Sequence, residues 1–126
     1  MDKRRIKGII DEYFRACEGE WVVGEDGEVA RDKQGEPMRR GARVPTVAGL
    51  SVALGLSSKE ALLRMRGEGS VGRAIGRALC RIEDDAARRL FDKDTVRGAE
   101  FVLRCQYHWG DGGENQGERV VIVDDV

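Results

Sequence analysis

Residues 46–66, TVAGLSVALGLSSKEALLRMR, constrain the fold of this chain more than any other stretch. Apolar residues recur at helical spacing on both sides of Gly55, and a glycine at such a point supplies the left-handed conformation that ends many helices. Thr46 follows a proline and is a typical N-cap for the first helix. Ser57 and Glu60 have the spacing of a capping box at the start of the second helix. The sequence therefore predicts two short helices joined by a tight turn.

A helix-turn-helix normally places its second helix in the major groove of DNA. The residues expected to face DNA are polar or basic side chains of that helix, namely Ser58, Lys59, Arg64 and Arg66. Three arginines that precede the helices are expected to add phosphate contacts, namely Arg39, Arg40 and Arg43. Residues 37–66 carry six basic residues and one acidic residue, whereas residues 110–126 carry five acidic residues and one basic residue. This asymmetry indicates that the first region meets an anionic partner and that the C-terminal end is kept away from it.

The composition predicts a soluble, helix-rich protein of one small domain with appendages. Of 126 residues, 40% are apolar and 36% are charged. No apolar run approaches the roughly 20 residues that cross a bilayer, and the basic N-terminus lacks the apolar stretch of a signal peptide. We therefore expect a cytoplasmic protein without a membrane partner. The cysteines Cys17, Cys80 and Cys105 are far apart and are expected to be buried, reduced thiols.

The N-terminal third predicts a helix and then a β-hairpin. Residues 2–18 carry apolar side chains three and four positions apart, which indicates an amphipathic helix. Its start is basic, which suits either a solvated helix end or a nearby phosphate. Residues 20–44 lose the helical period and predict an irregular hairpin with arms 21–31 and 36–44 and a turn at 32–35. Asp26–Gly27 is a rival turn, and disorder is the alternative.

Residues 70–109 predict a pair of helices that mediates oligomerisation. Ser70 is expected to cap a long helix that runs to about Lys93, and Asp94 is expected to cap the next one. The apolar seam expected on the long helix comprises Val71, Ile75, Ala78, Leu79, Ile82, Ala86, Leu90 and Phe91. The residues expected to contact other subunits are charged side chains of the opposite face, namely Arg77, Arg81, Asp84, Asp85 and Arg88. Ion pairs between residues four apart, Asp84 with Arg88 and Asp85 with Arg89, explain the acidic run better than a metal site does.

Nothing in the sequence predicts catalysis. GEGSVG at residues 67–72 imitates a phosphate-binding loop, but such a loop follows a buried strand and this one follows a helical pattern. His108 is the only histidine and has no nucleophile to activate. The sequence shows no recognisable arrangement of paired carboxylates, of a Ser/His/Asp set or of metal ligands. We expect no catalytic residues, no metal, no cofactor and no enzymatic activity.

The C-terminal residues predict a strand. The β-branched run RVVIVDDV has no partner nearby in sequence, so its core residues are expected to pair between subunits, namely Val120, Val121, Ile122 and Val123. The expected organisation is a DNA-binding part at residues 1–69, a helical oligomerisation hairpin at 70–109, and an acidic linker with a strand at 110–126. The fold class is mainly α, with a helix-turn-helix core and an inserted β-hairpin.

These segments together resemble the small terminase subunit of tailed bacteriophages, the DNA-packaging protein family. The matching segments are YFRAC in the first helix, PTVAGLSVALGL, RALCRIEDDAARRL and GAEFVL, with an aromatic end at Trp109. The resemblance covers about residues 6–109, and the order and spacing of the segments carry it.

The resemblance implies a ring-shaped homo-oligomer in the host cytoplasm that performs no chemistry itself. Such a ring recognises the packaging site on double-stranded viral DNA, recruits the large terminase subunit and regulates its ATPase and nuclease. C-terminal strands of the family assemble into an intersubunit β-barrel. Some members end in a basic tail, whereas this chain ends in Asp124-Asp125-Val126, so DNA contact through the extreme C-terminus is not expected. Two alternatives remain open: a helix-turn-helix transcriptional regulator acting as a dimer, and an assembly protein that binds no DNA.

Overall fold

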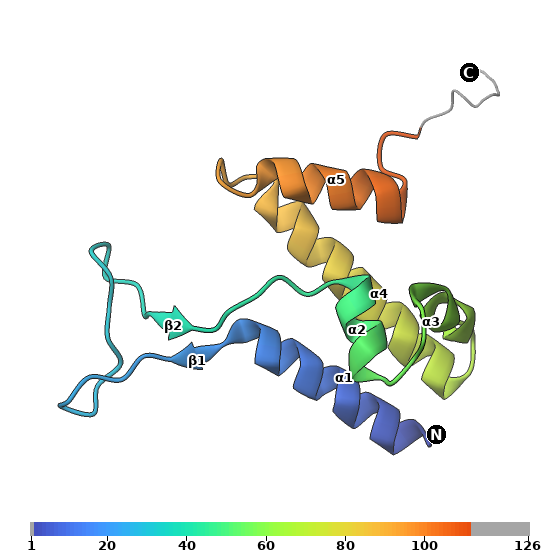
Figure 1. The fold of residues 1–126 in the computed structure, drawn as a ribbon, viewed down its shortest axis with the longest axis horizontal. Coiled ribbons are helices and arrows are strands. Elements are labelled where there is room, and N and C mark those ends of the chain that lie inside the picture. Colours follow the sequence, from blue (N-terminus) through green and yellow to red (C-terminus); the bar gives the residue numbers. More distant parts are fainter. Residues whose placement is uncertain (1, 112–126) are drawn as a thin grey trace. The chain divides into compact units, whose positions relative to one another are not determined.

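A computed structural model describes residues 2–111, of which 56% lie in helices. The helices in chain order are α1 (Lys3–Glu18), α2 (Val47–Ala53), α3 (Lys59–Met65), α4 (Ser70–Arg89) and α5 (Val96–Tyr107). Two strands, β1 (Glu20–Trp21) and β2 (Arg39–Arg40), form a small antiparallel sheet between α1 and α2 in the sequence (Figure 1). The prediction of a mainly α fold with an inserted antiparallel pair is confirmed. The chain forms two compact units, Met1–Cys80 and Arg81–Val126, which divide inside α4.

The first helix, α1, begins and ends at residues suited to those positions. The Asp2 carboxylate accepts a hydrogen bond from the backbone N–H of Arg5 at 2.9 Å, and Gly19 ends the helix at φ 81°. A side-chain carbon at Gly19 would lie only 2.6 Å from the carbonyl oxygen of Arg40, so the chain at the end of β2 approaches too closely for any other residue. The predicted apolar stripe is buried at Ile6, Ile10, Tyr13, Phe14 and Cys17.

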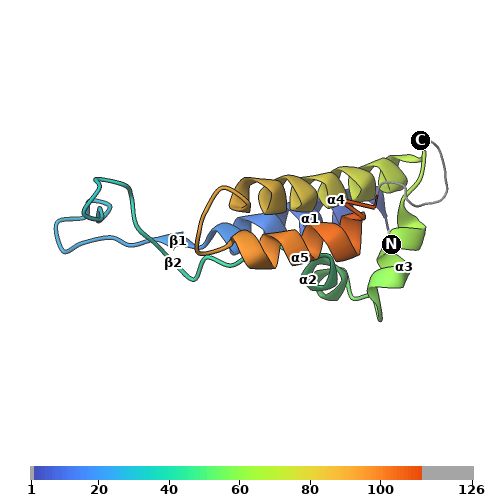
Figure 2. The same ribbon diagram turned by 90° about the horizontal axis from the view of Figure 1, so that it is seen from above.

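Tyr13 joins α1 to the start of α2, and the two helices lie side by side (Figures 1 and 2). Its hydroxyl accepts a hydrogen bond from the Thr46 N–H at 2.9 Å and donates one to the Thr46 carbonyl at 3.3 Å. The Thr46 hydroxyl in turn accepts from the Gly49 N–H at 2.9 Å, which confirms Thr46 as the cap of α2. A side-chain carbon at Gly49 would collide with the Tyr13 hydroxyl. The contact therefore depends on both a phenol and a glycine.

The turn between α2 and α3 is the predicted one. Gly55 has φ 76°, and the Leu56 N–H donates to the Ser51 carbonyl at 2.9 Å. The predicted cap of α3 is wrong by one residue, because the side chain of Ser58, not that of Ser57, accepts from the Ala61 N–H at 3.1 Å. The helix begins at Lys59, so Ala61 is the third helical residue, whose N–H an N-cap side chain normally satisfies.

The inserted segment, residues 19–44, differs from the single hairpin that the sequence predicts. Both candidate turns form: the Gly27 N–H donates to the Gly24 carbonyl at 3.0 Å, and the Gly35 N–H donates to the Asp32 carbonyl at 3.0 Å. Gly19, Gly27 and Gly35 are spaced eight residues apart, have φ between 81° and 83°, and each precede a glutamate. The predicted turn at 32–35 is confirmed, but the predicted first arm, residues 21–31, is wrong as one continuous strand because the chain also reverses at residues 24–27.

Three backbone hydrogen bonds hold the repeats of the inserted segment together in a closed ring. The Val22 N–H donates to Met38, the Met38 N–H to Ala30, and the Ala30 N–H to Val22, at 2.9, 2.8 and 2.8 Å. β1 and β2 extend the ring with Glu20 opposite Arg40 and Trp21 opposite Arg39.

The first unit also contains the start of α4. Ile75, Ala78 and Leu79 of the predicted seam are buried there. A side-chain carbon at Gly72 would lie 2.5–2.6 Å from the backbone of Gly67. The glycines of GEGSVG therefore allow a close turn between α3 and α4, and the segment before them is a helix, as expected.

The second unit departs from prediction at the end of α4. The helix ends at Arg89 rather than near Lys93, so Phe91 lies beyond it and is 92% exposed instead of completing the seam. The predicted cap Asp94 is also wrong: Thr95 precedes α5 and makes no capping bond, because its hydroxyl donates to the Arg89 carbonyl at 2.8 Å.

The burial of the cysteines corrects a further prediction. Cys17 is buried, but Cys80 and Cys105 are exposed because each lies on a helix face turned away from the apolar seam. Within residues 2–111, no helix has both the length and the apolar character needed to cross a membrane.

Candidate nucleic-acid interface

The α2–α3 pair presents its basic side chains to the outside. Leu50 of α2 and Leu62 of α3 are fully buried, which fixes the two helices against the rest of the first unit. Lys59, Arg64 and Arg66 are exposed, and none of their side chains makes an ion pair or a hydrogen bond to any residue that the structure describes. Three cations at one short helix are therefore free to bind an external anion.

Ser58 is the exception among the four predicted residues of α3. It is half-buried, and its hydroxyl accepts the capping bond from Ala61. The position remains next to Lys59, but the hydroxyl oxygen is already engaged in holding the helix start.

The three arginines before α2 have different surroundings. The guanidinium of Arg39 lies 3.7 Å from the centroid of the Trp21 ring, and its Nη1 lies 3.6 Å from the Glu18 carboxylate. Arg39 thus already has an aromatic and an anionic neighbour, which stabilise its position beside β1. Arg40 and Arg43 are exposed and have no such side-chain partner among residues 2–111.

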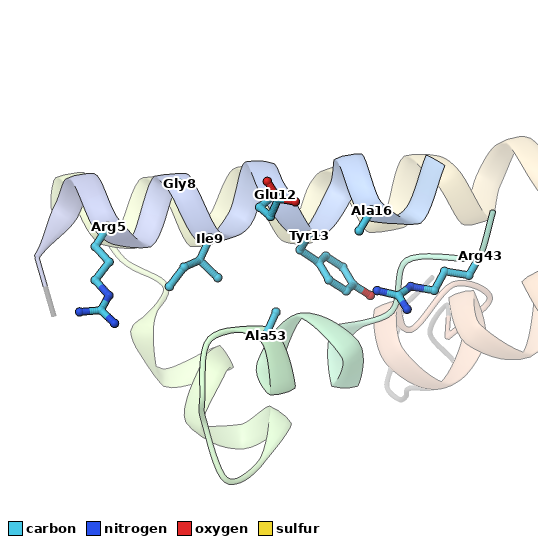
Figure 3. Close-up of a pocket in the computed structure, with 8 residues that line it drawn as sticks. All are labelled: Arg5, Gly8, Ile9, Glu12, Tyr13, Ala16, Arg43 and Ala53. Atoms are coloured by element: carbon cyan, nitrogen blue, oxygen red, sulfur yellow. The ribbon is translucent and has the colours of Figure 1, made fainter. Parts of the chain in front are cut away.

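A hollow of about 490 Å³ lies against α1 and was not anticipated from the sequence. Figure 3 shows its lining, which comprises Arg5, Gly8, Ile9, Glu12, Tyr13, Ala16, Arg43 and Ala53. The α1 residues recur at spacings of three and four, so they form a second stripe beside the buried one. That spacing marks the α1 side of the hollow in the sequence, but the hollow itself also requires α2 to lie beside α1.

The charged residues predicted to mediate oligomerisation lie on α4. Arg88 Nε is 2.9 Å from Asp84 Oδ2, and Arg89 Nε is 2.7 Å from Asp85 Oδ2, so the predicted ion pairs four residues apart are confirmed. The Asp84 carboxylate raises the pKa of the Arg88 guanidinium further. Arg77 and Arg81 are exposed. The predicted strand residues 120–123 lie outside the residues that the structure describes.

The groups considered for chemistry are dispersed in the described part of the chain. Between residues 2 and 111, no three His, Cys, Asp or Glu side chains gather closely enough to hold a metal ion. His108 is exposed, takes the left-handed conformation at the end of α5, and places Nδ1 3.1 Å from Asp111 Oδ2. Trp109 donates its indole N–H to Glu83 at 2.7 Å, which ties the end of α5 to the second half of α4.

Comparison with known proteins gives no relative. No protein-family model matches the chain, and no curated protein or solved structure matches it either.

Proposed function

We propose that this protein is the small terminase subunit of a tailed phage, a homo-oligomer that binds viral packaging DNA and recruits and regulates the large terminase ATPase and nuclease. The resemblance of residues 6–109 to that family supports the assignment. The observation that carries it is the capped α2–α3 pair, whose cations Lys59, Arg64 and Arg66 are exposed and have no partner in residues 2–111.

The proposed contacts divide into two kinds. Arg64 and Lys59 flank the outer face of α3 and approach base edges and nearby phosphates in the major groove. Arg40 and Arg43 contact phosphates, which supply most of the affinity and make it fall with salt. Arg39 contributes less, because a phosphate must compete with Trp21 and Glu18 for its guanidinium.

A mobility-shift titration with duplex DNA tests the role of α3. The double variant Lys59→Ala/Arg64→Ala is expected to bind at least about tenfold more weakly, since hydrogen bonds to charged groups are the stronger ones. Lys93→Ala/Arg97→Ala is the matched control: it removes one exposed lysine and one exposed arginine from the second unit. Equal affinity of the α3 variant and wild type would remove the helix pair from the mechanism.

The oligomeric state distinguishes the terminase from its alternative. Light scattering on the purified chain is expected to give the mass of a large closed ring. A two-fold dimer is what a helix-turn-helix regulator on a palindromic operator forms, and it would replace the terminase assignment while leaving DNA binding in place. Binding that is absent even at low salt would instead favour an assembly protein.

The C-terminal residues 120–123 have the proposed role of pairing between subunits. Deletion of residues 118–126 is expected to change the mass of the assembly in native mass spectrometry. An unchanged mass would contradict that role.

A further inference from the structure

The hollow beside α1 has a cation at each end and an apolar floor. Arg5 comes from the first turn of α1 and Arg43 from the segment that leads into α2, and Figure 3 shows them at opposite ends of the hollow. Ile9, Ala16 and Ala53 supply apolar surface between them. Gly8 adds no side chain, so this stretch of the α1 face stays open.

The charges of the hollow favour an anion. The guanidinium groups of Arg5 and Arg43 make no ion pair or hydrogen bond to any residue between 2 and 111. The one acidic lining residue, Glu12, is paired with Arg15 on the same helix. The Tyr13 hydroxyl is already bonded to Thr46. An incoming anion therefore meets two unpaired guanidinium groups and no unpaired carboxylate of the lining.

The hollow lies next to the proposed DNA-reading helices. Ala53 is the last residue of α2, so Arg5 shares the hollow with the end of the helix that leads into the Gly55 turn. In helix-turn-helix proteins, elements before the recognition helix cross the sugar-phosphate backbone and set the register of the reading helix. A backbone running past α2 would meet both arginines.

We propose that this hollow binds the phosphate backbone of duplex DNA, with Arg5 and Arg43 each contacting a phosphate. The site rests on the proposed DNA-binding function and adds to it a positioning contact outside the α2–α3 pair. Arginine suits the role because its planar fork of N–H donors matches two phosphate oxygens.

Lys7 provides a matched comparison on the same helix. It is exposed and only two residues from Arg5, yet it does not line the hollow. At 3.6 residues per turn, positions two apart point about 200° away from each other, so Lys7 projects from the opposite side of α1. If Arg5 affected DNA binding only through the overall charge of the protein, loss of the Lys7 charge would weaken binding as much as loss of the Arg5 charge.

The test is the salt dependence of duplex binding, measured by fluorescence anisotropy. Arg5→Gln/Arg43→Gln is compared with Lys7→Gln/Lys33→Gln, which loses the same charge at two exposed positions outside the hollow. The first variant is expected to bind at least about tenfold more weakly and to lower the slope of log affinity against log salt by about 2, one phosphate for each arginine. The second is expected to stay close to wild type. Circular dichroism verifies that both remain folded.

The outcomes separate this site from the function on which it rests. If both double variants weaken binding equally, the hollow is not a phosphate site, although DNA binding stands. If wild type fails to bind duplex DNA at low salt, the proposed function falls and the site falls with it. If Arg5→Gln/Arg43→Gln keeps its DNA affinity but loses affinity for polyglutamate, the hollow takes a carboxylate-rich partner, and the proposal is contradicted.

Discussion

The cations of α3 and three arginines of the second unit have opposite surroundings. The side chains of Lys59 and Arg64 are exposed and make no ion pair or hydrogen bond to any residue between 2 and 111. In the second unit, three arginines pair with acids four residues earlier on the same helix, namely Arg88 with Asp84, Arg89 with Asp85 and Arg104 with Glu100. These three arginines offer balanced charge, whereas the cations of α3 are all unpaired among the described residues.

This difference indicates what each unit presents to a partner. An unpaired cation binds a phosphate without first giving up an acidic neighbour, which supports the proposed contact of the first unit with DNA. The second unit combines three paired arginines with two exposed phenylalanines, since Phe91 is 92% and Phe101 66% exposed, whereas the exposed Trp21 of the first unit lies beside the Arg39 guanidinium. Exposed aromatic residues amid balanced charge suit a protein partner better than DNA.

The largest difference in stability is expected between a substitution in the core of the first unit and one at an exposed residue of the second unit. Leu62→Ala should lower the free energy of unfolding by about 2–5 kcal/mol, because Leu62 is fully buried between helices and leaves a cavity. Phe91→Ala should change it by less than about 0.5 kcal/mol. Urea denaturation at low protein concentration measures both. A loss for Phe91→Ala that grows with protein concentration would show that Phe91 is buried between copies.

Two helical glycines should respond to alanine with opposite signs. Gly49→Ala pushes a methyl group into the Tyr13 hydroxyl and should lower the free energy of unfolding by about 1–3 kcal/mol. Gly98→Ala in α5 meets nothing within 4 Å and should raise it by about 0.4–1 kcal/mol, because alanine restricts the unfolded chain. Thermal melts of the two variants test the pair. Equal signs would contradict the close α1–α2 contact.

The smallest contrast in stability is between hydrogen bonds that link two helices and an ion pair within one helix. Tyr13→Phe removes both bonds to Thr46 and should cost about 1–2 kcal/mol, whereas Asp85→Asn breaks its pair with Arg89 and should cost less than about 1 kcal/mol. Chemical denaturation at neutral pH compares the two. A larger loss for Asp85→Asn would mean that its ion pair matters more than the α1–α2 link.

Tyr13 also predicts a pH dependence. Burial raises the pKa of its hydroxyl above the ordinary value of 10.0, so the unfolded chain loses this proton first. The stabilisation is complete below pH 10.0 and is lost as the pH rises through the higher pKa of the folded state. Denaturation curves at alkaline pH should therefore decline more steeply for wild type than for Tyr13→Phe, and parallel declines would contradict a raised pKa at Tyr13.

Periodicity and caps in the sequence predicted much of the fold. The stripe of α1, the Thr46 cap and the Gly55 turn follow from local rules, since each depends on residues close together in the chain. The cap of α3 was missed by one residue, because two adjacent serines compete for the position. The end of α4 was missed by about four residues, because the hydroxyl of Thr95 bonds back to the Arg89 carbonyl. The three-repeat form of the inserted segment was missed because its hydrogen bonds close a ring between distant residues.

Prediction of the candidate site was less complete than that of the fold. The basic residues of α3 were identified from the sequence, but the engagement of Arg39 with Trp21 depends on the pairing of β1 with β2. The hollow needed α1 and α2 to be placed side by side, which no local pattern gives.

The salt dependence of duplex binding tests the central claim most directly. Fluorescence anisotropy across about 50–200 mM salt gives a slope that counts the phosphates neutralised. Lys59→Ala/Arg64→Ala is expected to weaken binding and to reduce the slope by between 1 and about 2, whereas Lys93→Ala/Arg97→Ala is expected to leave both unchanged. Equal slopes for the two variants, or a larger loss for the second, would contradict the claim that the free cations of the first unit are the ones that meet DNA.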